Sequence, residues 1–409
     1  MATPTATTKA LRSRFSYHFS GKINWYPGHM AKATRLIQDT LKAADMVLEV
    51  RDARIPFSSV NPTLEELIKA RQMPHLLLLH KADLADPSFE AEIVDHFAKY
   101  KNKQALFTSS VLSTKSNNIN NNLANIIPAA IDLYLRSKQQ KQSSSASSSA
   151  GSTPTPTPSP SPSSSSPSPL PPQKKELMLM IVGVPNVGKS TLINKLRAVN
   201  NLRTASAKTG PLPGVTRGLN CFKVSERPVA AYLMDTPGIM MPRINDVEVG
   251  LKLSLVGAIK ESVVGKKAIA DYLLYSMNRL GNRSYLHTKT LLSRPSSQQQ
   301  AQPQQKDEQQ KDEQEDEPTD DINAVLLSIA KRIGAKKKKK KEDNNQEAKS
   351  EEKDEERWDL DLAAGHFLQK YREGAFGRMT LDTMPLPPAS PFAVMNVRSS
   401  KNKQQQKKK

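Results

Sequence analysis

The composition of the chain limits the classes of protein to which it can belong. It has 409 residues and a formal net charge of +20, with 37% hydrophobic and only 5% aromatic residues. A surface this basic concentrates polyanions, so nucleic acid or an anionic membrane is the expected partner. The single cysteine, Cys221, excludes an internal disulfide framework and a cysteine-rich metal site. No apolar run approaches the length of about 18 residues that a membrane-spanning helix needs.

Segments of low complexity divide the chain into blocks. One is mostly Ser and Pro, a second is Gln with charged residues, and a third is nearly all Lys and Glu, so none can offset the entropy of ordering. The lysine run 336–341 in the third is most simply a solvated tract. We expect a presequence or disordered start at 1–20, folded halves at 21–138 and 174–245, a disordered Ser/Pro linker at 139–173, a helical domain at 246–385 with disordered insertions at 293–320 and 335–357, and a disordered basic tail at 386–409.

The start of the chain is basic, contains Ser and Thr, and has no acidic residue before Asp39. A positive segment is drawn through an energised membrane, and carboxylates would oppose that movement. The pattern therefore favours an organelle transit peptide. A disordered basic start with no targeting function is the alternative.

The first folded half alternates helices and strands. Between Met30 and Ala44 the apolar residues, Leu36 among them, recur at spacings of three and four, which indicates one buried helical stripe. "MVLEV", 46–50, follows as a strand. Strands separated by helices imply a parallel sheet, whose ligands lie beyond the carboxyl ends of the strands. The remaining predicted elements are a helix at 63–71, a strand at 75–79, a helix at 87–100, a strand at 104–109 and a helix at 120–136.

Two of these strands end in residues that suit recognition of guanine. "HKAD", 80–83, is similar to the Asn-Lys-x-Asp loop of small GTPases, with Asp83 placed to accept from both guanine donors and Lys81 to lie along the ring face. His80 replaces the usual Asn, and its ring N–H could donate to the base or to a phosphate loop. Ser109 and Ser110 occupy the loop whose backbone N–H would meet the guanine oxygen. Alone, "HKAD" would be an ordinary strand-to-helix turn.

The second folded half carries the strongest motif in the chain. "ELMLMIV", 176–182, suits a buried strand, and "GVPNVGKS", 183–190, fits the phosphate-loop pattern G-x-x-x-x-G-K-[ST] and leads into a helix. Backbone N–H groups of such a loop cradle phosphates, the lysine neutralises the terminal ones, and the serine hydroxyl binds Mg²⁺. We expect the nucleotide to be bound by His80, Lys81, Ala82, Asp83, Ser109, Ser110, Asn186, Val187, Gly188, Lys189, Ser190, Thr191 and Gly238.

Residues downstream of the phosphate loop suit metal binding and switching. "VAAYLMDTPGI" places Asp235 at the end of a predicted strand, where its carboxylate can hold Mg²⁺ through water and the Gly238 N–H can reach the γ-phosphate. The loop "GPLPGVTRG" offers Thr216, which would close on Mg²⁺ when the γ-phosphate is present. Asp235 could also be only a helix cap. The predicted Mg²⁺ ligands are Ser190, Thr216 and Asp235.

The base-reading motif precedes the phosphate-binding motif, which reverses the usual order. Rotating the chain order of a closed domain leaves its site intact, because domain termini lie close together and exposed loops tolerate the cut. The Ser/Pro linker would then join the two positions that are the chain termini in a domain of the usual order. We therefore predict that the two halves form a single pocket, with a P-loop NTPase-like, mostly parallel sheet in circularly permuted order and a small all-α C-terminal domain.

This order, with the motifs quoted, resembles the circularly permuted GTPases of ribosome assembly. "INWYPGHMAKA", "DARIPFSSVNP" and "GVPNVGKSTLIN" are most similar to the mitochondrial ribosome-associated GTPase 1 branch. The resemblance covers about 20–138 and 174–285, and more weakly 322–385. It implies a GTPase that is stimulated by ribosomal particles, assists assembly of the mitochondrial large subunit and binds its rRNA. It also implies a monomer in the matrix, with peripheral attachment to the inner membrane as one option.

The resemblance also implies roles for individual residues. Ile239 stands where signalling GTPases carry a water-orienting glutamine, and an isoleucine cannot orient water. His29 of "WYPGHM" would take that role, which gives a catalytic set of His29, Lys189 and Thr216; a capping or packing histidine is the alternative. Asn186 matches the asparagine that binds K⁺ beside the phosphates, or is a simple turn residue.

The C-terminal part should supply the ribosome-binding surface. Residues 249–280 predict two helices, and 361–382 resemble the closing helix and basic turn of the family's ribosome-binding domain. Lys370, Arg372 and Arg378 could there meet rRNA phosphates, although such cations are more often only solvated.

Two other interpretations remain open on the sequence. One is an RNA-binding or ribosome-binding scaffold whose nucleotide site is structural, which Ile239 favours. The other is the same GTPase activity in the chloroplast, the cytosol or the nucleolus, where lysine-rich tracts are common.

Overall fold

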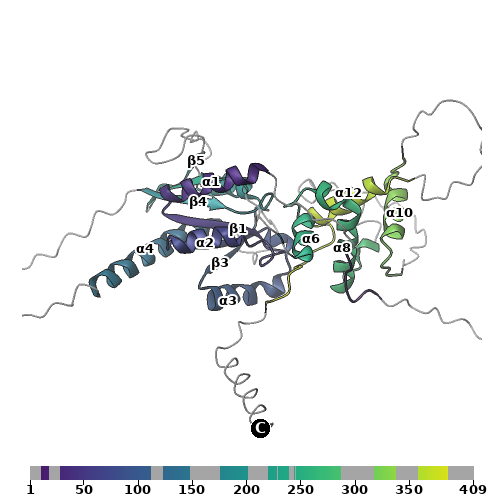
Figure 1. The fold of residues 1–409 in the computed structure, drawn as a ribbon, viewed down its shortest axis with the longest axis horizontal. Helices are drawn as coiled ribbons and strands as arrows, with labels where there is room; N and C mark the ends of the chain where they lie inside the picture. The colour runs from purple at the N-terminus through teal and green to yellow at the C-terminus, as the bar shows by residue number, and fades with distance from the viewer. Residues whose placement is uncertain are drawn as a thin grey trace, which may run out of the picture.

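The structure, a computed structural model, describes residues 11–17, 28–111, 123–147, 176–200, 220–227, 229–238, 244, 246–286, 317–337 and 358–385. Its centre is one six-stranded sheet with the order β3-β2-β1-β4-β6-β5 (Figure 1). Neighbouring strands are parallel except β5, which pairs antiparallel with β6. The strands are β1 (Met46–Asp52), β2 (His75–His80), β3 (Gln104–Thr108), β4 (Glu176–Val182), β5 (Cys221–Ser225) and β6 (Ala230–Asp235).

The two halves of the chain meet in the middle of this sheet. β1 from the first half pairs in parallel with β4 from the second, with Met46 opposite Leu179 and Glu49 opposite Val182. Both strands are buried along almost their whole length, as parallel strands covered on both faces are. The sheet confirms the predicted mostly parallel fold, assembled from segments on either side of the Ser/Pro linker.

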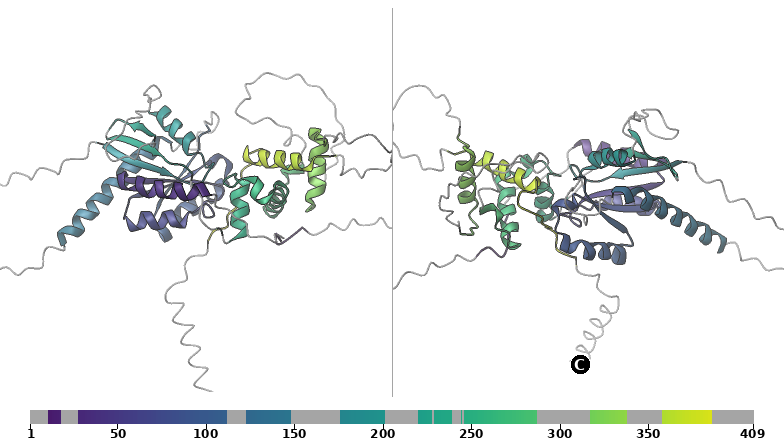
Figure 2. Two further views of the ribbon diagram at one scale, coloured as in Figure 1. Left: turned by 45° about the horizontal axis from the view of Figure 1, so that its top comes forward. Right: turned by 180° about the vertical axis from the view of Figure 1, so that it is seen from behind.

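Helices cover both faces of the sheet (Figures 1 and 2). On one face, Ile37 and Leu41 of the first helix pack with Val47 of β1. On the other, Ile127 and Leu192 from later helices pack with Leu48, the next residue of β1. This alternation is the period-two pattern of a strand with two buried faces. The first face carries α1 (Gly28–Ala43), α2 (Pro62–Ala70) and α3 (Glu90–Lys101), and the second carries α4 (Leu123–Ser147) and α5 (Lys189–Val199).

A helical domain lies beside the carboxyl ends of the strands (Figure 1). Three of its helices begin at an aspartate whose side chain accepts from a backbone N–H of the first turn, namely Asp246, Asp321 and Asp359. Leu326 and Phe367 are fully buried in its core. Its helices are α6 (Val247–Leu255), α7 (Glu261–Val264), α8 (Lys266–Arg279), α10 (Ile322–Ile333) and α12 (Leu360–Arg372).

Several element boundaries differ from the prediction. α4 continues to Ser147, past the predicted start of the linker at 139. The predicted helix at 87–100 divides into a short 3₁₀ turn, η2 (Pro87–Phe89), and α3, because Pro87 supplies a turn capped by Asp86. The predicted pair of helices at 249–280 is three helices, and β5 was not predicted.

The edges of two predicted insertions are also structured. The carbonyl of Thr319 and a carboxylate oxygen of Asp320 both accept from the amide of Asn278 on α8. Lys336 forms an isolated antiparallel bridge with Trp358, next to a hydrogen bond from the Asp359 N–H to the Ala335 carbonyl. Of these residues, Thr319 and Asp320 were assigned to a disordered insertion at 293–320, and Ala335 and Lys336 to another at 335–357. The assignment of disorder is therefore wrong at these edges.

Residues 11–17, assigned to a presequence or disordered start, pack on the helical domain. The Arg12 guanidinium forms an ion pair with Asp271 of α8 at 2.7 Å and also contacts Asp320. The Phe15 ring lies 5.2 Å from the Tyr272 ring in an edge-on arrangement. The prediction of disorder is therefore wrong for this segment, because Arg12 and Phe15 find an acidic and aromatic surface that is distant in the sequence. Among the described residues, no helix is both long and apolar enough to cross a membrane.

Candidate functional site

The phosphate loop connects the buried strand β4 to α5. Gly188 has φ of +99° at the start of α5, and a Cβ there would lie 2.7 Å from His80 Cδ2, so only glycine fits between loop and ring. Asn186 also has positive φ, at +60°. Val187 is buried in the core below, which fixes the loop to the sheet. The loop therefore turns its backbone N–H groups toward the N-terminus of α5, where anions are favoured.

Lys189 folds over this loop. Its Nζ donates to the carbonyls of Gly183 and Val184, each at 3.1 Å. Burial lowers the pKa of Lys189 to about 8, although the nearby Asp235 carboxylate raises it. The lysine is therefore partly desolvated and held by neutral carbonyls, and a bound phosphate would be a better partner for its charge.

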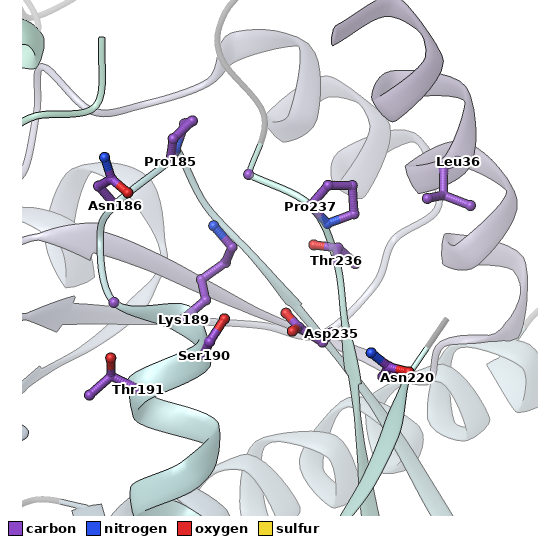
Figure 3. A pocket seen from close by; sticks show the side chains of 12 residues that line it. Leu36, Pro185, Asn186, Lys189, Ser190, Thr191, Asn220, Asp235, Thr236 and Pro237 are labelled. Atoms are coloured by element: carbon purple, nitrogen blue, oxygen red, sulfur yellow. The ribbon is translucent and has the colours of Figure 1, made fainter. Parts of the chain in front are cut away.

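Asp235 faces Lys189 and Ser190 across the mouth of the site (Figure 3). Burial raises the pKa of Asp235, and the opposing charge of Lys189 works against that rise. A half-buried carboxylate beside a serine hydroxyl is an oxygen donor set that suits Mg²⁺. The adjacent Thr236 is fixed to the sheet, since its hydroxyl donates to the Ile181 carbonyl at 2.6 Å. Ser190 and Asp235 thus fit the predicted metal site.

Gly238 brings the segment after β6 against the phosphate loop. A Cβ at Gly238 would lie 2.8 Å from Pro185 Cα and 3.1 Å from Lys189 Nζ. Such close approach places the Gly238 backbone beside the groups expected to hold the terminal phosphate. The contact of the Gly238 N–H with the γ-phosphate stays a prediction.

A cavity of about 670 Å³ lies over the phosphate loop. Five lining residues were not assigned to the site from the sequence. Pro185, Thr236 and Pro237 lie within the quoted motifs, whereas Leu36 on α1 and Asn220 before β5 lie outside them (Figure 3). Leu36 was placed in the buried stripe of α1, but it is only partly buried, while the adjacent Ile37 faces the core. No feature of the sequence distinguishes Leu36 from its neighbours. The other lining residues are Pro185, Asn186, Gly188, Lys189, Ser190, Thr191, Asp235, Thr236, Pro237 and Gly238.

The base-reading loop lies directly beside the phosphate loop. Lys81 has left-handed φ of +62°, and its Nζ donates to the Asn186 carbonyl at 2.7 Å. The same ammonium lies 3.1 Å from the buried carboxylate of Asp52, which in turn pairs with Arg54. The base-reading loop and the phosphate loop, which are 105 residues apart at this contact, therefore meet at the carboxyl ends of the strands. Asp52 is therefore a further residue of the site that was not predicted. Its position at the end of the strand β1 is the one feature of the sequence that could have indicated it.

Asp83 and the serine loop are also adjacent. The Ser109 hydroxyl donates to Asp83, and the Val111 N–H donates back to the Ser109 oxygen. Ala82 is buried at the start of the 3₁₀ turn η1 (Ala82–Leu84) that carries Asp83. The structure thus joins the two loops predicted to contact guanine.

His80 lies between the serine loop and the phosphate loop. Its ring is buried, with Nδ1 3.0 Å from the Thr108 hydroxyl and Nε2 3.0 Å from the Ser110 hydroxyl. Burial lowers the pKa of His80 to about 4, so the ring is neutral near pH 7. Both ring nitrogens are engaged by hydroxyls, and the ring edge contacts Gly188. His80 therefore joins three segments of the site, and its donation to a base stays a prediction.

The structure does not describe every predicted site residue. Thr216 and Ile239 lie outside the described residues, and so does the side chain of His29. The backbone of His29 belongs to the first turn of α1. It precedes Leu36 by two helical turns and so shares a helix face with a residue that lines the cavity.

The three cations that could meet rRNA make contacts within the protein, and Arg378 is also exposed. Arg372 donates to the carbonyls of Leu255 and Ser254 at the end of α6, and Lys370 is buried. Arg378 donates to the carbonyls of Ala82 and Ala85 in the base-reading loop. Arg372 and Arg378 thus bind helix and loop carbonyls, whereas Lys370 lies 3.6 Å from the carboxylate of Glu373.

The helical domain also contacts the phosphate loop. The side-chain amide of Asn186 donates to the carbonyl of Gly257, after α6, at 2.7 Å. This bond fixes the orientation of the amide and leaves its oxygen as the remaining acceptor. A K⁺ ligand of this kind would therefore be oriented by the helical domain.

Comparisons with known proteins agree with this geometry. The family described as 50S ribosome-binding GTPase matches residues 178–331. A mouse protein named mitochondrial ribosome-associated GTPase 1 is 38% identical over 70% of this chain and 77% of its own length. Mitochondrial GTPase 1 of Aedes aegypti is 32% identical over 88% of this chain and 93% of its own. Ribosome biogenesis GTPase A of Bacillus licheniformis is 38% identical over 61% and 73%.

Proposed function

Because this chain belongs to the mitochondrial ribosome-associated GTPase 1 family, we propose that it hydrolyses GTP and assists assembly of the large subunit of the mitochondrial ribosome. The bond from Lys81 to the Asn186 carbonyl carries the proposal, since it brings the base-reading loop and the phosphate loop together. Neither half would bind a whole nucleotide alone. A guanine nucleotide would span that contact, with its base toward Asp83 and its phosphates toward Lys189.

We assign each step to residues of this chain. Lys189 leaves the loop carbonyls for the terminal phosphates, and Ser190, Asp235 and Thr216 would hold Mg²⁺. Bound Mg²⁺ would neutralise charge on the β- and γ-phosphates. Since Ile239 cannot orient water, we assign that task to His29, which precedes the cavity-lining Leu36 by two turns of α1. We further propose that Asn186 binds K⁺ beside the phosphates.

We propose the mitochondrial matrix, including the matrix side of the inner membrane, as the location. The names of the mouse and mosquito relatives support the mitochondrion. Because residues 11–17 pack on the helical domain, we place the end of any presequence before Leu11. The ribosomal partner would be the immature large subunit and its rRNA, bound by a monomer.

The test is GTP hydrolysis with and without purified large-subunit particles, using the full chain and Lys189→Ala. We expect slow intrinsic turnover, stimulation by particles, and loss of both in the variant. Equal rates of hydrolysis with and without particles would contradict the proposal that ribosomal particles stimulate this GTPase. If Lys189→Ala still supported ribosome maturation in cells, the scaffold interpretation would be correct instead.

A further inference from the structure

The last described segment, 374–382, returns from α12 to the base-reading loop. Arg378 Nη2 donates to the Ala82 carbonyl and Nε to the Ala85 carbonyl, both at 2.9 Å. The next residue, Met379, donates its N–H to the Leu84 carbonyl at 3.0 Å. The Asp86 N–H donates to the Thr380 hydroxyl at 3.1 Å. Four backbone groups around Asp83 therefore have partners in this segment.

The loop depends on these partners because it has little structure of its own. Its one 3₁₀ turn is closed by hydrogen bonds from the Leu84 and Ala85 N–H groups to the Lys81 and Ala82 carbonyls. The hydrogen bonds of such a turn have poorer geometry than those of an α-helix. The two carbonyls that Arg378 spans lie on either side of Asp83. The planar fork of arginine presents its N–H groups to both carbonyls in a fixed geometry, whereas the flexible ammonium of a lysine is less preorganised for this.

The other end of the segment is fixed to the helical domain and to the loop after β1. Asp382 accepts from the backbone N–H groups of Phe57 and Ser58, each at 2.8 Å. Its carboxylate also lies 3.2 Å from the ammonium of Lys252 on α6. A movement of the helical domain would therefore be transmitted to the turn that carries Asp83.

We propose that Arg378 is a positioning residue for guanine recognition, and that segment 374–382 makes nucleotide release depend on the helical domain. This inference rests on the proposed function. A simple packing contact between domains would be the alternative. It would not be expected to affect which base is bound, whereas a positioning role must.

The experiment follows release of a fluorescent GDP analogue from the full chain after addition of excess GDP. It also compares competition by GDP, by ADP and by inosine diphosphate, the last of which lacks the exocyclic amine that Asp83 would read. The variants are Arg378→Ala, Arg378→Lys and Thr380→Val, which removes one acceptor without changing side-chain volume. Lys267→Ala, which changes an exposed lysine on α8 of the same domain, is the matched control.

We expect Arg378→Ala to release the analogue about tenfold faster, because two charge-assisted bonds to the loop are lost. Its preference for GDP over inosine diphosphate should fall, with Arg378→Lys and Thr380→Val intermediate and Lys267→Ala unchanged. Wild-type release and wild-type preference in Arg378→Ala and Thr380→Val would overturn the inference. If the wild-type chain itself failed to prefer GDP over ADP, the proposed function would fail instead.

Discussion

At the scale of single residues, His80 shows how a departure from a common motif can be accommodated. The ring nitrogens form hydrogen bonds with the hydroxyls of Thr108 and Ser110, and the ring edge occupies the space that a side chain at position 188 would need. A neutral imidazole suits this site because it offers one donor and one acceptor. We expect His80→Leu to raise the dissociation constant of GDP about tenfold, through loss of two hydrogen bonds. His80→Asn, which keeps a donor and an acceptor, should stay near wild type.

Isothermal titration with GDP would measure both variants, with circular dichroism to show that each is folded. Because the pKa of His80 is lowered to about 4, the affinity of the wild-type chain should show no step between pH 5 and 7 from this residue. Equal affinity in the leucine and asparagine variants would contradict a hydrogen-bonding role.

Lys189 gives a second prediction at this scale. Burial lowers the pKa of its ammonium to about 8, whereas phosphate binding favours the charged form. Above pH 8 the free protein has lost this proton and must regain it to bind, so GDP affinity should fall as pH rises. The slope approaches about tenfold per pH unit beyond the pKa. Measuring the dissociation constant from pH 7 to 9 tests this, and Lys189→Arg, which stays charged, should remove the dependence.

At the scale of elements, the motifs and the order of helices and strands could be predicted, but partners distant in the sequence could not. The phosphate loop and "HKAD" follow buried strands whose apolar runs are visible in the sequence. β5, "CFKVS", is short and mixed in polarity, so it becomes a strand only through pairing with β6. Arg12, Arg372 and Arg378 look like surface charge until the fold brings carboxylates and carbonyls to them.

The N-terminal segment 11–17 gives the prediction at this scale. Arg12 pairs with Asp271 and Phe15 packs against Tyr272, so deletion of residues 1–17 should lower the melting temperature by several degrees. The loss of a partly buried ion pair and an aromatic contact corresponds to about 1–3 kcal/mol. Deletion of residues 1–10 should have little effect. Arg12→Ala should be destabilising and Arg14→Ala, an exposed control, should not. Differential scanning calorimetry would measure all four, and equal melting temperatures for the two deletions would refute docking.

At the scale of the whole molecule, one sheet is made from both halves of the chain. β1 and β4 pair directly, and one apolar core contains Leu48 from the first half and Leu192 from the second. The contact between the halves is therefore the interior of a domain, not a surface between two domains, and it should persist without a covalent connection.

A protease site inserted at about residue 160, within the linker between α4 and β4, tests this arrangement. After cleavage we expect the fragments to elute together in gel filtration and to bind GDP with an affinity close to that of the intact chain. The peptide connection contributes only the entropy of bringing the two halves together, which burial of the shared core should offset at micromolar concentration. Cleavage at a site inserted after Gly334 is the control, since it leaves both halves of the sheet connected. Fragments that separate in native buffer would show that each half folds alone, and a single nucleotide pocket across β1 and β4 would then be untenable.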